Sequence, residues 1–148
     1  MNLEEKINND IKESMKAKDQ AWLRGVRAVK AAILLAKTDG SGLELNEERE
    51  IKLLQKLVKQ RQDSLTIYET QNREDLAKVE REEIEIIQRY LPKQMTLEDL
   101  EAYIRDLILT HGANGIKDMG KIMGLASKGL SGKADGKTIA DLVKKMLV

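Results

Sequence analysis

The chain has 148 residues, no cysteine and a formal net charge of +1. This length allows one ordinary domain or two very small ones, and the lack of cysteine excludes disulfides and thiolate metal ligands. Aliphatic and charged residues dominate, with one proline and no phenylalanine. We therefore expect an all-α protein, because strands draw on β-branched and aromatic residues.

The sequence also predicts where the protein resides. No apolar run approaches the roughly 18 residues of a membrane-spanning helix. The N-terminus has neither a signal-peptide core nor the Arg-rich character of a transit peptide. We expect a cytoplasmic protein that does not contact membranes, and we expect a monomer.

The first two helices are marked by their caps. Asn2 with Glu5 forms a capping box, and Asp19 is the expected N-cap of the second helix. The apolar spacing that follows each cap predicts two buried stripes: Leu3, Ile7, Ile11 and Met15 in the first helix, and Leu23, Val26, Val29 or Lys30, and Ile33 in the second.

A loop at residues 38–42 precedes the third helix, which we expect to start near Asn46 and to break at residues 70–72. Asn72 and Asp75 form a second expected capping pair. The fourth helix should stop near Leu91, because Pro92 disfavours the helical region for the residue before it. The predicted stripes are Ile51, Leu54, Leu57, Val58, Leu65 and Tyr68, then Leu76, Val79, Ile84, Ile87 and Leu91.

Three shorter helices are expected after Pro92. Thr96 with Asp99 caps the fifth helix, Asp118 the sixth and Asp135 the seventh. Gly112 is a natural stop for the fifth helix. We therefore place a domain boundary at Pro92, with a four-helix domain at residues 1–92 and a three-helix domain at residues 93–148.

Most groups that could carry chemistry have a simpler explanation. We interpret Glu80, Glu83, Glu85 and Arg89 as one solvated helix face with i,i+4 pairs. The single histidine, His111, lies at an expected helix end without further metal ligands nearby. The sequence therefore predicts no catalytic residue, no metal and no cofactor.

Glycines at residues 112–115 and 129–136 invite comparison with a phosphate-binding P-loop. That motif requires GxxxxGK followed by Ser or Thr after a strand. Here Ala134 follows Lys133, and a helix precedes the segment. We interpret these glycines as turns and helix ends.

The charge is distributed unevenly along the chain. Residues 1–92 hold 17 basic and 18 acidic residues, whereas the 37 residues from Gly112 hold seven lysines and three acids. Such a cluster is either a solubilising surface or a patch that contacts nucleic-acid phosphates. Few aromatic residues are interspersed, which favours folded RNA over stacked single strands. The nucleic-acid-binding candidates are Lys117, Lys121, Lys128, Lys133 and Lys137.

The whole chain resembles the YqeY-like proteins, small bacterial proteins with a relative in the mitochondria of fungi. Several segments carry this resemblance. They are residues 26–32 (VRAVKAA), 59–64 (KQRQDS), 72–76 (NREDL), Glu80, Glu83, 90–92 (YLP), 118–124 (DMGKIMG) and 132–136 (GKADG).

The second half is also similar to the tail domain of the B subunit of the tRNA-dependent Asp/Glu amidotransferase. In that enzyme, a carbon–nitrogen ligase with glutamine as amido donor, the amidase lies in another subunit. The tail contributes helical contacts to bound tRNA. The resemblance thus implies a binding module without an active site of its own.

Three hypotheses follow. The first is a non-catalytic accessory module that binds tRNA, or a tRNA-charging or amidotransferase complex, through the lysines and the N-termini of the last two helices. The second is a protein-interaction adaptor that presents Arg61, Asp63, Arg73 and Asp75 on its long helices. The third is an enzyme, as part of a carbon–nitrogen ligase or through buried carboxylates at Glu80 or Glu83.

Overall fold

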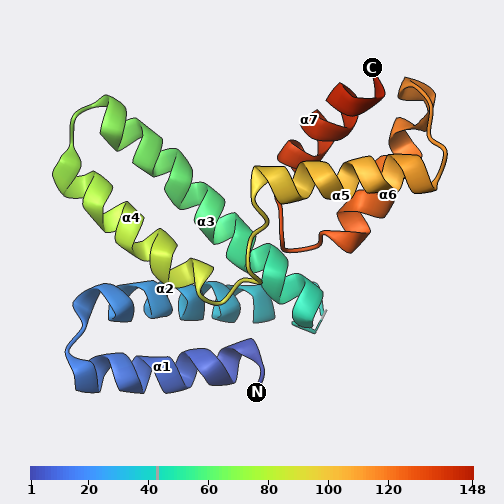
Figure 1. The fold of residues 1–148 in the computed structure, drawn as a ribbon. Coiled ribbons are helices and arrows are strands. Elements are labelled where there is room, and N and C mark those ends of the chain that lie inside the picture. The colour runs from blue at the N-terminus through green and yellow to red at the C-terminus, as the bar shows by residue number, and fades with distance from the viewer. Residues whose placement is uncertain (43) are drawn as a thin grey trace. The chain divides into compact units, whose positions relative to one another are not determined.

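The computed structural model describes residues 1–42 and 44–148. These residues form seven α-helices and one short 3-10 helix, with no strand among them, which confirms the all-α prediction. The chain divides into two compact units, Met1–Leu91 and Pro92–Val148 (Figure 1). None of the helices in the described ranges has the length and apolar content needed to cross a bilayer.

The first unit contains four helices: α1 (Leu3–Ala17), α2 (Gln20–Lys37), α3 (Glu47–Thr70) and α4 (Glu74–Gln88). Helix α2 packs on α1, α3 and α4, and α3 and α4 form an antiparallel hairpin (Figure 1). Their shared core consists of Leu3, Ile7, Leu23, Val26, Val29, Ile33, Leu54, Val58, Ile84, Ile86 and Ile87.

Side-chain caps begin the first three helices, as predicted. The Asn2 Oδ1 atom accepts a hydrogen bond from the Glu5 N–H at 2.9 Å, and Glu5 accepts one from the Asn2 N–H at 3.0 Å. Asp19 caps α2 and Asn46 caps α3 in the same way. Each cap satisfies an N–H group that the helix itself leaves without a partner.

The predicted capping pair of α4 is wrong. Asn72 adopts the left-handed conformation, with φ of 55°, and closes the tight turn after α3. Asparagine tolerates this conformation better than most residues. Arg73 therefore takes the N-cap position, without a side-chain cap, and its guanidinium pairs with Asp75 at 3.0 Å.

The apolar stripe of α1 also differs from the prediction. Ser14 is fully buried, whereas Met15 is 54% exposed. The Ser14 hydroxyl donates to the Ile11 carbonyl at 3.0 Å, which satisfies its polar atom inside the core. A small, internally bonded serine thus occupies a fully buried position of α1.

Helices α2 and α4 meet at a glycine. A Cβ atom added at Gly25 would lie 2.6 Å from the Cβ of Ile86. Ile86 is buried but was absent from the predicted stripe of α4. The missing side chain at Gly25 therefore lets Ile86 pack directly against the α2 backbone.

The second unit contains α5 (Leu97–Thr110), the 3-10 helix η1 (Ile116–Asp118), α6 (Met119–Gly129) and α7 (Gly136–Leu147). Helices α5, α6 and α7 contact one another. Before α5, the Met95 N–H donates to the Lys133 carbonyl at 2.9 Å, which fastens the start of this unit to the α6–α7 loop. The core consists of Leu100, Ile104, Ile122, Ala126, Leu130, Ile139, Leu142, Val143 and Leu147.

Two of the three predicted caps in this unit are confirmed. Thr96 caps α5 and Asp135 caps α7. Asp118 does precede α6, but its carboxylate makes no cap bond to that helix. It accepts a hydrogen bond from the Asn114 N–H at 2.7 Å instead and so stabilises the α5–α6 connection.

Candidate nucleic-acid interface

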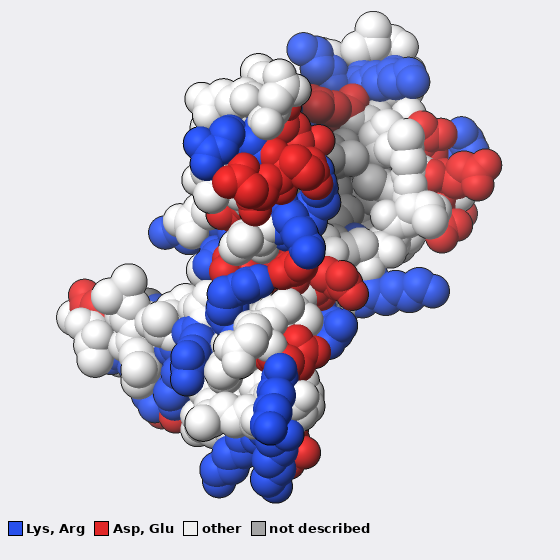
Figure 2. Space-filling view, turned by 90° about the vertical axis from the view of Figure 1, so that its left-hand side faces the viewer, with Lys and Arg blue, Asp and Glu red and all other residues white. Residues whose placement is uncertain are grey.

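Charged side chains of the first unit neutralise one another. The described residues contain eleven ion pairs, and all of them lie within Met1–Leu91. Arg24 reaches Glu82 at 2.5 Å and thereby joins α2 to α4. Figure 2 shows the outcome on one face, where blue and red side chains lie next to one another.

The second unit has a different charge arrangement. None of its described residues forms an ion pair, although it carries nine basic residues. All five predicted lysines are exposed. Their positive charge is therefore available to an anionic ligand. The exposed lysines after Gly112 are Lys117, Lys121, Lys128, Lys133, Lys137, Lys144 and Lys145.

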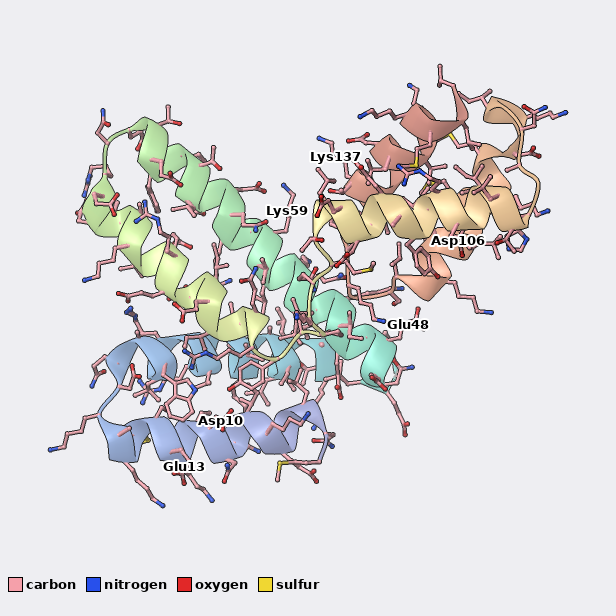
Figure 3. All side chains as sticks on the ribbon, viewed as in Figure 1. Asp10, Glu13, Glu48, Lys59, Asp106 and Lys137 are labelled. Carbon is pink, nitrogen blue, oxygen red and sulfur yellow. The ribbon has the colours of Figure 1, made fainter. Side chains whose placement is uncertain are left out.

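Helical spacing sorts these lysines into two sets. Lys117 lies in η1, just before α6. Lys121 and Lys128 are seven residues apart on α6 and share its solvent side. Lys137 and Lys144 are seven residues apart on α7 and share its solvent side. Lys133 lies in the connecting loop. Figure 3 shows Lys137 on the first turn of α7.

The solvent side of α6 is unusually flat between its lysines. Gly120 and Gly124 are exposed, and a Cβ atom at either position would meet no atom within 4 Å. A glycine within a helix costs roughly 0.5–1 kcal/mol relative to alanine, and no packing contact explains these two. A surface without side chains, bordered by lysines, lets a sugar–phosphate backbone approach the helix closely. This open face can be recognised in the sequence only when Gly120 and Gly124 are placed on the same helix as Lys121 and Lys128.

The N-terminus of α7 is occupied by the protein itself. The Asp135 carboxylate accepts from the N–H groups of Lys137 at 2.9 Å and Thr138 at 3.2 Å. The Thr138 hydroxyl and these amides lower the pKa of Asp135, in that order of importance. A phosphate at this helix end would face a carboxylate. The expected help from the α7 N-terminus stays a prediction that this cap disfavours, and the lysines themselves form the candidate interface.

The residues predicted to bind a protein partner do not form one surface. Arg61 is 18% exposed and turns toward α4, where its guanidinium pairs with Glu83 at 2.8 Å. Asp63 lies two residues further, about 200° around the helix, and pairs with Lys59. Arg73 and Asp75 pair with each other at the start of α4.

The acidic face of α4 is only partly solvated. Glu85 and Arg89 form the expected i,i+4 pair at 3.4 Å. Glu83, however, has a side chain that is only 17% exposed and lies beside Arg61. The prediction that Glu83 belongs to a solvated helix face is therefore wrong. Burial, and then the Glu83 charge, raise the pKa of Glu80. We interpret these groups as a cross-helix charge cluster that joins α3 to α4.

Other polar groups of the first unit are also structural. Tyr90 donates a hydrogen bond to Asp10. Figure 3 shows Asp10 on the side of α1 that faces α2. Burial and this contact raise the pKa of Tyr90. No group of three or more metal-ligating side chains occurs within the described ranges, and His111 is exposed at the end of α5.

The fold and the interface define a small all-α protein with two helical units, of which the second presents unpaired cations. The chain belongs to the family described as Yqey-like protein, which it matches over residues 4–147. This finding confirms the family resemblance.

Fungal relatives carry the name "Altered inheritance of mitochondria protein 41, mitochondrial". The protein of Vanderwaltozyma polyspora is 30% identical over 120 residues, which cover 76% of this chain and 64% of the relative. That of Clavispora lusitaniae is 36% identical over 108 residues, with 73% and 61% covered. That of Meyerozyma guilliermondii is 42% identical over 85 residues, with 57% and 44% covered. The chain thus spans about half to two thirds of these relatives.

The comparisons correct the expected location. These relatives are named as mitochondrial proteins, which points to mitochondria rather than to the cytoplasm. The cytoplasmic prediction rested on the lack of a membrane-spanning apolar run and on the N-terminal composition of the chain.

Proposed function

We propose that this chain is a non-catalytic accessory module that binds tRNA through its second unit. The observation that carries the proposal is the set of exposed lysines after Gly112, which have no ion-pair partner among the described residues. When such cations neutralise phosphates, the counterions condensed on the nucleic acid are released, and this release favours binding.

The open face of α6 supports a folded RNA as the ligand. Lys121 and Lys128 stand on either side of Gly124, where no side chain blocks a backbone. Double-helical RNA is recognised mainly through its shape, its phosphates and its 2′-hydroxyls. The similarity to an amidotransferase tail further favours tRNA, alone or in a tRNA-charging or amidotransferase complex.

The alternative of an adaptor that uses Arg61, Asp63, Arg73 and Asp75 has weaker support. Each of these groups already pairs within the first unit. A partner would have to replace those contacts before gaining any of its own.

The test is tRNA binding as a function of salt. We compare the native chain with a variant in which Lys121, Lys128, Lys133 and Lys137 are changed to Glu. Each lost phosphate contact should lower the slope of log K against log salt by about one unit, so we expect a slope smaller by about three to four units.

A second variant controls for total charge. Changing Lys6, Lys12, Lys18 and Lys56 to Glu alters the net charge equally, but in the first unit. This variant should keep most of the tRNA affinity and the slope of the native chain. Absence of salt-dependent tRNA binding at low ionic strength, or equal losses in both variants, would refute the proposal.

A further inference from the structure

A second candidate surface lies in the first unit, between the end of α2 and the start of α3. A hollow of about 230 Å³ opens there. Three of its six lining residues are apolar and three are cationic, and no carboxylate lines it. They are Ala36, Leu45 and Leu53, and Arg49, Lys52 and Lys56.

The cations form one stripe along α3. Arg49, Lys52 and Lys56 follow one another at three and four residues, so they share one side of the helix. Arg49 is anchored, because it donates to the Glu44 carbonyl at 3.0 Å and pairs with Asp39 at 3.5 Å. Lys52 pairs with Glu48 in solvent, and Lys56 forms no ion pair with any described residue. An acidic ligand could therefore engage Lys56 without displacing a partner.

An exposed leucine lies next to the hollow in the chain. Leu35 precedes Ala36 on α2 and is 73% exposed. Lys37 lies about 200° around the helix from Leu35 and pairs with Glu4 of α1 at 3.0 Å. Leu35 is thus on the side of α2 that faces away from α1, beside Ala36 but outside the lining of the hollow.

We propose that this hollow binds one amphipathic α-helix of a partner protein, with acidic residues beside its apolar face. Such a helix would place apolar side chains on Leu53 and Leu35 and carboxylates against the α3 stripe. Charge selects the acidic class, because three cations and no carboxylate line this hollow. The neighbouring hollow at α1 differs, since Glu4, Glu44 and Glu50 line it together with Lys37.

The shape and polarity of the surface disfavour other ligands. Ala36, Leu45 and Leu53 line a concavity, and Leu35 beside it is a single protruding side chain, whereas a lipid bilayer takes up side chains that protrude. A nucleic acid would leave the apolar floor without a partner. The inference is independent of tRNA binding, because it concerns the other unit of the chain.

The test uses two synthetic peptides and the full chain. Both peptides are helix-forming, about 20 residues or 30 Å long, with leucines at i, i+3/i+4 and i+7. One has glutamates flanking the leucines and the other has lysines. Binding is followed through the backbone amide NMR signals of the isotope-labelled protein. We expect the acidic peptide to shift signals in residues 32–36 and 45–56 and to bind at least about tenfold more tightly than the basic one.

Exposed positions supply variants that should not disturb the fold. Leu35→Asp and Lys56→Glu should each weaken the acidic peptide about tenfold. Ile67→Asp, 54% exposed near the other end of α3, and Lys12→Glu on α1 make the same chemical changes elsewhere and should have no effect.

Several results would overturn the proposal. They are no binding of the acidic peptide up to about 1 mM, equal affinity for the basic peptide, or equal losses in the control variants. Binding to phosphatidylglycerol vesicles that Leu35→Asp abolishes would assign the surface to a membrane instead. Dimerisation in sedimentation experiments that the same change abolishes would assign it to a second copy of the chain.

Discussion

The two units of this chain use charge in opposite ways. In Met1–Leu91, carboxylates and cations from different helices pair, as Arg24 does with Glu82 and Arg61 with Glu83. In Pro92–Val148, the acids Asp118 and Asp135 bond backbone N–H groups, and the lysines around them have no ion-pair partner within the described residues. Charges of the first unit therefore support the fold, whereas the cations of the second unit are available for a ligand.

The helical glycines of the two units differ in a parallel way: one is buried in the packing, and the other is exposed to solvent. Gly25 is buried against Ile86, so the packing of α2 on α4 requires it. Gly124 is exposed, and its surroundings contain nothing that a side chain would touch. One residue type thus serves internal packing in the first unit and leaves an open surface in the second.

Substitution of Gly25 should have the largest effect on stability. In Gly25→Ala, the new methyl group would lie 2.5–2.6 Å from Ile86 side-chain atoms, so α2 and α4 must separate. Overpacking of this kind costs about 2–3 kcal/mol, more than the gain in helix propensity. Urea unfolding, monitored by circular dichroism and by Trp22 fluorescence, measures the loss.

Gly124→Ala is the matched control for this change. With open space at Gly124, the helix propensity of alanine should raise the free energy of unfolding by about 0.5–1 kcal/mol. If both substitutions stabilised the chain, the close contact between Gly25 and Ile86 would not exist as described. A bulkier Gly124→Phe should keep the fold but weaken tRNA binding.

The pair between Arg61 and Glu83 should have the next largest effect. Arg61→Met keeps an aliphatic stem over the core but leaves Glu83, which is 17% exposed, without its cation. Breaking one side of a partly buried pair should cost about 1–2 kcal/mol, less than a fully buried pair would. Chemical denaturation measures this loss.

A double-mutant cycle tests whether the pair is the cause. Adding Glu83→Gln to Arg61→Met should cost less than the sum of the single changes. Lys52→Met removes the partner of Glu48 in a solvent-exposed pair on the same helix and should change stability by less than about 0.5 kcal/mol. Equal losses at Arg61 and Lys52 would contradict a structural role for the cross-helix pair.

Local signals in the sequence predicted much of the fold. The caps at Asn2, Asp19, Asn46, Thr96 and Asp135 follow from short polar side chains that precede apolar periodicity, and the structure confirms them. These features depend on residues three or four positions apart, so they can be recognised without knowledge of the tertiary structure.

The errors arose where a distant residue decides the outcome. Ile86 is buried because Gly25 of another helix makes room, and Glu83 because Arg61 of α3 reaches it. Periodicity within one helix cannot reveal such partners. The lysines of the candidate site were recognised from their charge, whereas the open face around Gly124 required the helix register and the surrounding contacts.

Of the three destabilising substitutions, Asp135→Ala should have the smallest effect, and it tests whether this acid stabilises the fold of the otherwise cationic tail. Hydrogen bonds from the Thr138 hydroxyl and from backbone amides lower its pKa in the folded chain. A carboxyl group with a lowered folded-state pKa adds stability above its unfolded pKa, near 3.8, and this stability is lost as pH falls through the folded value. At pH 7, Asp135→Ala should therefore destabilise α7 by about 1 kcal/mol.

Asp135→Asn keeps an acceptor oxygen, so it should retain most of the cap but lose the acid dependence below about pH 4. Hydrogen exchange of the Ile139–Val143 amides in the full chain measures both effects, and equal acid dependence in Asp135→Asn and the native chain would assign that dependence to other carboxylates.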